Sequence, residues 1–159
     1  APRNSMGRGV FLVESERELA RVAAGAECLY VQEYLPIDRD LRVTVVGDRV
    51  VASCWRIGGD GFRHNVARGG ELCFDGIPAE AVELVSRIAA ELGVDHAGFD
   101  VAMVDGRPLL LELNVLFGNQ ALNRLGIDTG PVILDYLERQ TRPAAPPDQP
   151  TRPPLRLAS

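Results

Sequence analysis

Short apolar runs, which in one case alternate with polar residues, mark three stretches of the chain and predict β-strands. Residues 5–13 lead from a glycine-containing turn into a strand, and residues 28–34 (CLYVQEY) predict a second strand. Residues 41–56 (LRVTVVGDRVVASCWR) predict two strands joined by a two-residue turn at Gly47-Asp48, of the type that has glycine first.

Three other stretches have the apolar spacing of amphipathic helices. Ser15 and Glu18 have the spacing of a capping box at the start of the first helix. The second runs from Pro78 to Leu92, with apolar residues at intervals of three and four and Gly93 suited to end it. Residues 129–140 predict a closing helix.

The stretch GFDVAMVDGRPLLLELN, residues 98–114, predicts a β-hairpin with one apolar and one polar face. Side chains alternate across a strand, so its apolar face comprises Phe99, Val101, Met103, Leu109, Leu111 and Leu113, and the reverse of the return strand holds Leu110, Glu112 and Asn114. Aligning the apolar faces sets Asp100 beside Glu112, whereas a slip of one residue would bury charge. A two-residue turn gives the wrong parity for this alignment. We therefore expect an odd-length connection, such as residues 105–107, or a bulge.

Two neighbouring carboxylates repel each other unless one is protonated or a cation lies between them. Asp100 and Glu112, with the Asn114 amide one step along, offer the oxygen ligands that suit a hard cation such as Mg²⁺. The alternative is an exposed sheet face on which the acids are solvated.

Five glycines fall between residues 58 and 70, so a loop is expected there. Its Arg63, Asn65 and Arg68 are donors that could close over an anion, because guanidinium groups match phosphate oxygens. The alternative is a surface loop with solvated arginines. Residues 5–9 (SMGRG) could also bind phosphate through backbone N–H groups, although their spacing is not that of a Walker A loop.

Composition limits the class of protein. The chain has 159 residues, 46% hydrophobic and 25% charged, which fits one globular domain. Its net charge of -5 argues against nucleic-acid binding. All 17 basic residues are arginine, so no chemistry here depends on lysine. The three cysteines are isolated and read as reduced core thiols.

The ends of the chain add three expectations. No apolar run approaches the ~20 residues of a membrane-spanning helix and no secretory signal is present, so a cytoplasmic protein is expected. The chain begins at Ala1 and reads as a fragment of a longer protein. Residues 143–159 contain six prolines and little to bury, so a disordered tail is expected there.

Four segments in order carry a family resemblance: SMGRGVFLV, VQEYLPIDRDLRVTVVGDRVVA, FRHNVARGG and LGVDHAGFDVAMVDGRPLLLELN. From about Asn4 to about Glu138 the chain resembles the ATP-grasp superfamily and, within it, the RimK-like amino-acid ligases. The resemblance implies an α+β fold in which helices pack on an antiparallel sheet, with a partial ATP-grasp domain over residues 1–142. It also implies ATP bound between two subdomains and Mg²⁺, or alternatively Mn²⁺, bridging its phosphates.

The resemblance implies a role for each matching residue. Nucleotide contacts are implied for Ser5, Gly7, Gly9, Gln32, Glu33, Tyr34, Asp40, Arg63 and Asn65. Residues 32–34 would contact adenine, Asp40 the ribose, and Arg63 and Asn65 the reacting triphosphate as catalytic residues. The implied metal ligands are Asp100, Glu112 and Asn114. Arg42 and Arg56 also fall at family-like positions, where they could equally brace the sheet.

The implied reaction joins a carboxylate to an amine. The carboxylate attacks the γ-phosphate, ADP leaves, and the amine or amino acid then displaces phosphate from the acylphosphate. Metal and arginine neutralise the phosphate charge, so no protein nucleophile is required. The implied partners are ATP, the two substrates and an N-terminal part of the same protein, with homo-oligomerisation left open.

Two departures from the family limit what the resemblance implies. The lysines that relatives place ahead of the Gly-rich loop are absent, so this segment alone is expected to bind ATP weakly and to turn over poorly. Phe117 also stands where relatives often have the proline of a Pro-Gly turn. The joined amino acid, often glutamate in relatives, therefore does not carry over.

Two other functions stay open at the level of sequence. One is a non-catalytic ATP-grasp module that binds a nucleotide or a partner protein. The other is a metal-dependent phosphoesterase, which lacks a clear third acid or general base here.

Overall fold

The computed structural model describes residues 10–58 and 70–141. Within these ranges the elements are α1 (Glu16–Ala23), β1 (Arg39–Val46), β2 (Arg49–Ile57), β3 (Glu71–Cys73), α2 (Ala79–Leu92), β4 (His96–Val104), β5 (Arg107–Asn114), α3 (Gln120–Arg124) and α4 (Thr129–Thr141). None of these helices is long and apolar enough to cross a bilayer.

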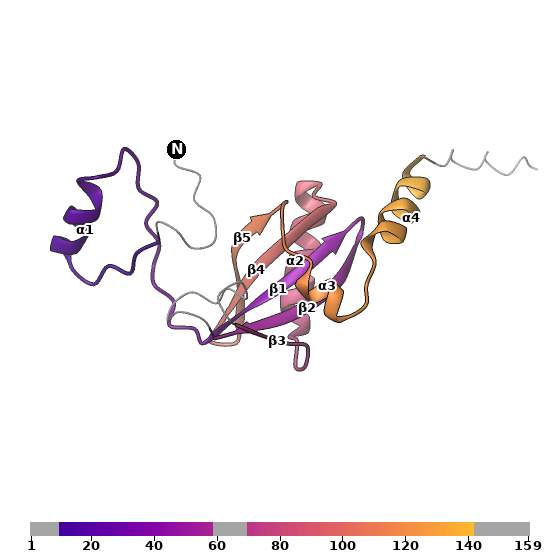
Figure 1. The fold of residues 1–159 in the computed structure, drawn as a ribbon, viewed down its shortest axis with the longest axis horizontal. Coiled ribbons are helices and arrows are strands. Elements are labelled where there is room, and N and C mark those ends of the chain that lie inside the picture. The colour runs from indigo at the N-terminus through magenta and orange to yellow at the C-terminus, as the bar shows by residue number, and fades with distance from the viewer. Residues whose placement is uncertain (1–9, 59–69, 142–159) are drawn as a thin grey trace, which may run out of the picture.

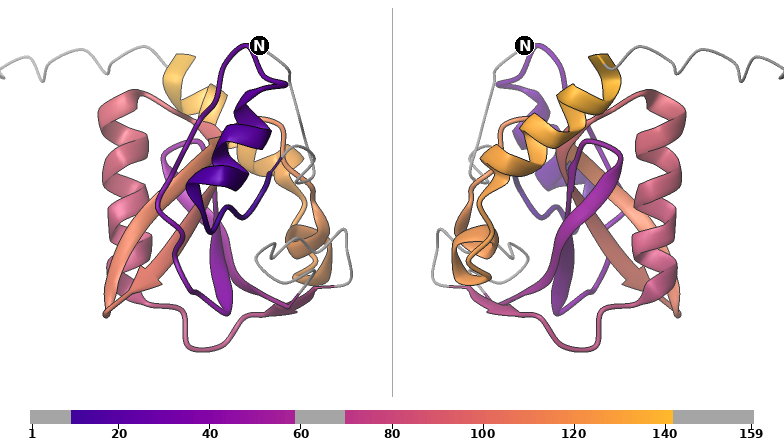
Figure 2. Two further views of the ribbon diagram at one scale, coloured as in Figure 1. Left: turned by 90° about the vertical axis from the view of Figure 1, so that its left-hand side faces the viewer. Right: turned by 90° about the vertical axis from the view of Figure 1, so that its right-hand side faces the viewer.

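The strands form one antiparallel sheet in the order β3-β2-β1-β4-β5. β4 pairs with β1, and α2 lies between β3 and β4 in the sequence. Figure 2 shows α2 along one side of the sheet and α3 on the other. The expected α+β fold with helices packed on an antiparallel sheet is confirmed.

The main core lies between α2 and one face of the sheet. It joins alternate residues of β1 and β4 to one side of α2, and its fully buried members include Leu41, Val43, Phe99, Val101 and Val85. Trp55 closes this core near the β3 edge. Its Nε1 donates a hydrogen bond of 3.2 Å to the Gly76 carbonyl, and the Arg39 guanidinium lies 4.4 Å from the indole centroid.

Capping and turn residues in the sequence predicted most helix boundaries and the first hairpin correctly. Ser15 caps α1 by accepting a hydrogen bond from the Glu18 amide at 3.3 Å. Gly93 ends α2 with a φ of 64°, the left-handed conformation that glycine adopts without strain. At the β1–β2 turn Gly47 has a φ of 67°, whereas Asp48 is not in the positive-φ region, which confirms the glycine-first turn.

The strands predicted at 5–13 and 28–34 are wrong wherever the structure describes them. Residues 10–14 and 28–34 form no strand. A strand needs a neighbour to satisfy its backbone N–H and C=O groups, and an apolar run alone supplies none. The short elements β3 and α3 were not predicted. Residues 5–9, the loop at 59–69 and the tail at 143–159 lie outside the described residues.

Candidate functional site

The β4–β5 hairpin has the predicted register at its polar end. Asp100 pairs with Glu112, and Gly98 pairs with Asn114. The connection is a two-residue turn with Asp105 and Gly106 at φ values of 50° and 74°, so the odd-length connection is wrong. The alternative, a bulge, is confirmed between Asp100 and Val101.

The bulge corrects the assignment of two leucines. Asp100 pairs with Glu112 but Val101 pairs with Leu110, so β5 contains one extra residue at that point. Directly opposed residues share a face, so Leu110 lies on the Val101 side and not with Glu112 as predicted. Leu109 pairs with Ala102 and therefore lies on the opposite face from its predicted one.

Asp100 is buried and held by two arginines. Its side chain is 7% exposed; Arg42 Nε lies 2.6 Å from Oδ1, and Arg56 Nη2 lies 2.9 Å from Oδ2. Burial raises the pKa of the Asp100 carboxyl, while Arg56 and Arg42 act in the opposite direction. The two guanidinium groups favour the ionised carboxylate that a cation site requires.

Arg56 also binds a second carboxylate. Its Nε and Nη2 donate to Oδ1 and Oδ2 of Asp40 at 2.6 and 2.7 Å, a forked arrangement of high geometric specificity. Burial acts to lower the pKa of Arg56, but the contacts with Asp40 and Asp100 raise it overall. Strand pairing sets four charged residues in a row across the sheet, because Asp40 opposes Arg56 and Arg42 opposes Asp100. We call these four residues the charged row.

The outer part of the site lies on the edge strand β5. The Asn114 side-chain amide donates to Glu112 Oε1 at 2.5 Å, and Glu112 is exposed. Within the described residues no group of three His, Cys, Asp or Glu side chains is gathered for a metal. The donor chemistry of two carboxylates and one amide still fits Mg²⁺, provided that the cation shares Asp100 with the arginines.

A shallow hollow of about 430 Å³ is lined in part by the residues that follow the end of β5. Its lining residues are His96, Val115, Leu116, Phe117, Asn119 and Thr129. The Phe117 ring packs on His96 with centroids 5.0 Å apart. Phe117 Cβ and the Arg42 guanidinium both lie over the Cα of Gly98, so the hollow adjoins the row of charged residues.

The structure brings together only part of the predicted site. Gln32, Glu33 and Tyr34 are exposed on the segment that leads into β1. Asp40 follows on β1 and reaches Asp100 through Arg56. Ser5, Gly7, Gly9, Arg63 and Asn65 lie outside the described residues.

From the sequence alone, Arg42 and Arg56 could either belong to the functional site or only brace the sheet. The available signal was their position: Arg42 alternates with Asp40 on one face of the predicted strand. Their contact with Asp100 depends on the pairing of β1 with β4, which are separated by β2, β3 and α2. No local pattern predicts that pairing.

The sheet, the helices on it and the acidic hairpin define a partial ATP-grasp domain of the α+β class. The chain belongs to the RimK-like ATP-grasp family, whose domain model matches residues 2–137.

Curated relatives include a probable alpha-L-glutamate ligase of Citrobacter koseri, 32% identical over 147 residues, covering 87% of this chain and 49% of that protein. A ribosomal protein bS6--L-glutamate ligase of Escherichia fergusonii is 31% identical, with the same coverage of 87% and 49%. The chain thus spans about half the length of these relatives.

Solved structures share the fold. The RimK domain protein ATP-grasp from Sphaerobacter thermophilus has a TM-score of 0.55 and 22% identity, covering 74% of this chain and 42% of that chain. The ATP-grasp ligase PsnB, complexed with a precursor variant, Mg and ADP, has a TM-score of 0.51 and 24% identity, covering 68% of this chain and 34% of PsnB.

Proposed function

We propose that the protein containing this chain is an ATP- and Mg²⁺-dependent ligase that joins a carboxylate to an amine or amino acid through an acylphosphate. The observation that carries the proposal is the pairing of Asp100 with Glu112, next to Asn114, on the polar face of the hairpin. Membership of the RimK-like family supports it. Such an ATP-consuming enzyme would work in the cytoplasm.

The residues divide into a metal side and a nucleotide side. Asp100, Glu112 and Asn114 would hold Mg²⁺, or Mn²⁺, which when bound neutralises phosphate charge during transfer. On the nucleotide side, residues 32–34 would contact adenine and Asp40 the ribose. Arg56 occupies both Asp40 oxygens, so a ribose hydroxyl would use their remaining lone pairs. Ser5, Gly7, Gly9, Arg63 and Asn65 complete the proposed phosphate contacts.

The metal side is tested by Glu112→Gln. An exposed, near-isosteric change should leave the fold intact but remove one of two carboxylate ligands, so Mg²⁺-dependent binding of ADP should fall about tenfold or more. Calorimetric titration measures it. Glu91→Gln, on the exposed side of α2, is the matched control and should bind like the wild type. Unchanged binding in Glu112→Gln would remove Glu112 from the metal site.

The reaction is tested by product analysis of the intact protein. ADP formation that requires both a carboxylate and an amine, with an amide product, supports ligation. Phosphate release without an amide would instead indicate hydrolysis.

A non-catalytic nucleotide-binding module is the second candidate. The ion pairs of Asp100 with Arg42 and Arg56 favour it, because arginine nitrogens already lie within ion-pair distance of both carboxylate oxygens, although Oδ1 has no hydrogen-bond partner among the described residues. Nucleotide binding without turnover in the intact protein would support this candidate.

A further inference from the structure

The charged row on the polar face is electrically balanced before any cation arrives. Asp40 and Asp100 contribute two negative charges, and Arg42 and Arg56 contribute two positive ones. All four side chains are largely buried, with exposed fractions of 9% and 7% for the acids and 17% and 13% for the arginines. Because water screens buried charges poorly, the arginines act strongly on anything that binds Asp100.

Both oxygens of Asp100 face guanidinium nitrogens. Oδ1 lies 2.6 Å from Arg42 Nε, whereas Oδ2 lies 3.2 Å from Arg42 Nη2 and 2.9 Å from Arg56 Nη2. Glu112 lies outside this row, is exposed and is hydrogen-bonded to Asn114. It adds one negative charge that no arginine of the row balances. A free divalent cation would therefore meet one net negative charge and two guanidinium groups.

We infer that Arg42 and Arg56 suppress binding of free divalent cations at Asp100, so that the metal enters together with nucleotide phosphates and not before them. The inference rests on the proposed metal role of Asp100 and Glu112. Phosphate oxygens bring further negative charge to the cation. They also supply oxygen ligands that the cation does not have to share with the arginines, as it must share the Asp100 oxygens. The two arginines thus act as positioning residues that set the order of binding.

Charge and geometry make different predictions for substitution. Lysine keeps the positive charge but loses the fork that matches a carboxylate, whereas glutamine removes the charge and keeps donors. If charge suppresses the cation, Arg42→Gln and Arg56→Gln should tighten binding and the lysine variants should not. If the arginines only brace the sheet, no variant should bind the cation more tightly than the wild type.

The probe is Mn²⁺ alone, titrated into the nucleotide-free chain and followed by electron paramagnetic resonance. Each glutamine variant should lower the Kd for Mn²⁺ about tenfold or more, because a unit charge next to the ligand is removed. Arg42→Lys and Arg56→Lys should stay within about threefold of the wild type. The control Arg49→Gln, on the exposed β1–β2 hairpin end, should change nothing. Circular dichroism verifies folding; the two sites give independent variants, so loss of fold in one leaves the other as the test.

The inference is overturned by glutamine variants that bind Mn²⁺ no more tightly than the wild type, or by lysine variants that tighten binding equally. Adding Glu112→Gln to Arg42→Gln should abolish the gain, and a gain that survives would place the ion elsewhere and also overturn it. The proposed function fails separately, through unchanged Mg²⁺-dependent ADP binding in the single Glu112→Gln variant.

Discussion

At the scale of single residues, the site depends on the absence of a side chain at Gly98. A Cβ built there would meet the Arg42 guanidinium and would lie 3.2 Å from Phe117 Cβ. The φ of Gly98 is not positive, so glycine is required for close approach and not for backbone conformation. The Arg42 side chain, which pairs with Asp100, occupies the space that a side chain at this position would need.

Gly98→Ala should therefore displace Arg42 and lower the free energy of unfolding by about 1–3 kcal/mol, the usual cost of overpacking a filled site. Urea denaturation measures the change. Gly118→Ala is the control, because a Cβ there meets no atom of the described residues within 4 Å and its φ is not positive; it should change stability by less than about 0.5 kcal/mol. Equal stability of Gly98→Ala and wild type would show that Arg42 is free to move.

The residues of the site differ in how well sequence could predict them. Asp100 and Glu112 come together because burial of Phe99 and Val101 fixes the register of one local hairpin, and the sequence shows this. Arg42 and Arg56 join them through pairings across β1, β2 and β4. Those pairings follow from the whole sheet, so sequence alone left the two arginines undecided.

At the scale of elements, α4 is fastened to the β1–β2 turn by exposed ion pairs. Arg139 donates to both Asp48 oxygens at 2.6 and 2.9 Å, and Arg49 pairs with Asp135. The Tyr136 ring lies against Gly47, where any Cβ would overlap it. Asp48 and Arg139 are 91 residues apart in the sequence.

The hydrogen bond from Arg139 lowers the pKa of Asp48 from 3.8 to about 2. A lowered pKa means that the pair stabilises the fold above pH 3.8 and that this contribution is lost as the pH falls towards 2. The Asp48 carboxyl should titrate near pH 2 by NMR. Arg139→Gln should return the midpoint towards 3.8. Arg49→Gln should move it less, because the charge of Arg49 has a smaller effect on the pKa of Asp48. A midpoint unaffected by Arg139→Gln would show that the pair does not form in solution.

The elements that sequence predicted are those with signals of their own. Caps and turn residues mark α1, α2 and both hairpins. The segment at 28–34 begins with a strand-like apolar run but forms no strand, and the three-residue β3 exists only because β2 offers it an edge. A strand is a pairing between segments, so its presence depends on chain that lies elsewhere.

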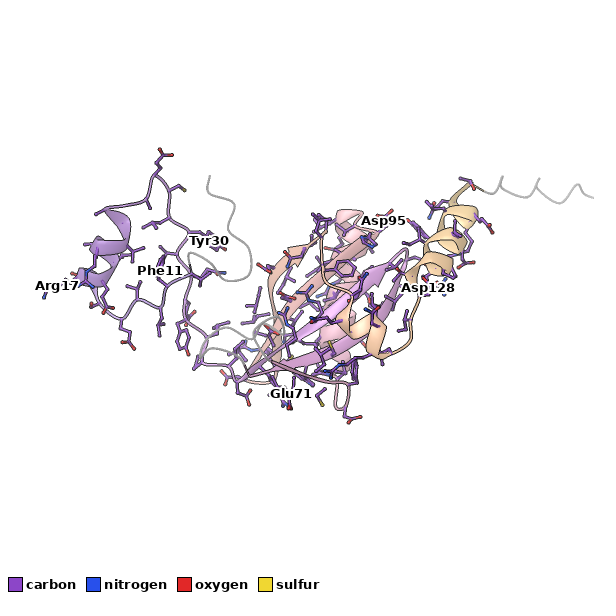
Figure 3. The ribbon with its side chains drawn as sticks, viewed as in Figure 1. Phe11, Arg17, Tyr30, Glu71, Asp95 and Asp128 are labelled. Carbon is purple, nitrogen blue, oxygen red and sulfur yellow. The ribbon has the colours of Figure 1, made fainter. Side chains whose placement is uncertain are left out.

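At the scale of the whole molecule, two regions differ in packing. The sheet with α2 has a continuous core, whereas residues 10–38 contain no buried residue. Figure 1 shows α1 and its neighbouring segments extending away from one end of the sheet. Phe11 and Tyr30, 63% and 85% exposed, belong to this part, and Figure 3 shows them far from the helices that cover the sheet.

Hydrogen exchange should separate these regions. An eight-residue helix is marginal in water without tertiary packing, so amides of α1 should exchange nearly as fast as those of an unstructured peptide. Amides in the centre of β1 and β4 should be protected by several orders of magnitude more. Mass spectrometry of the exchanging chain measures both. Protection of α1 equal to that of β1 would show that it packs against other chain in solution.

The burial of Trp55 provides a built-in spectroscopic reporter. It is the single tryptophan of the chain and is 4% exposed, on the α2 side of the sheet. Its neighbour Arg56 points to the opposite face. Indole emission should therefore shift to longer wavelength when the core opens, yet respond little to ions arriving on the far side. A label-free fluorescence trace can thus distinguish a variant that has lost its fold from one that has only changed its ligand affinity.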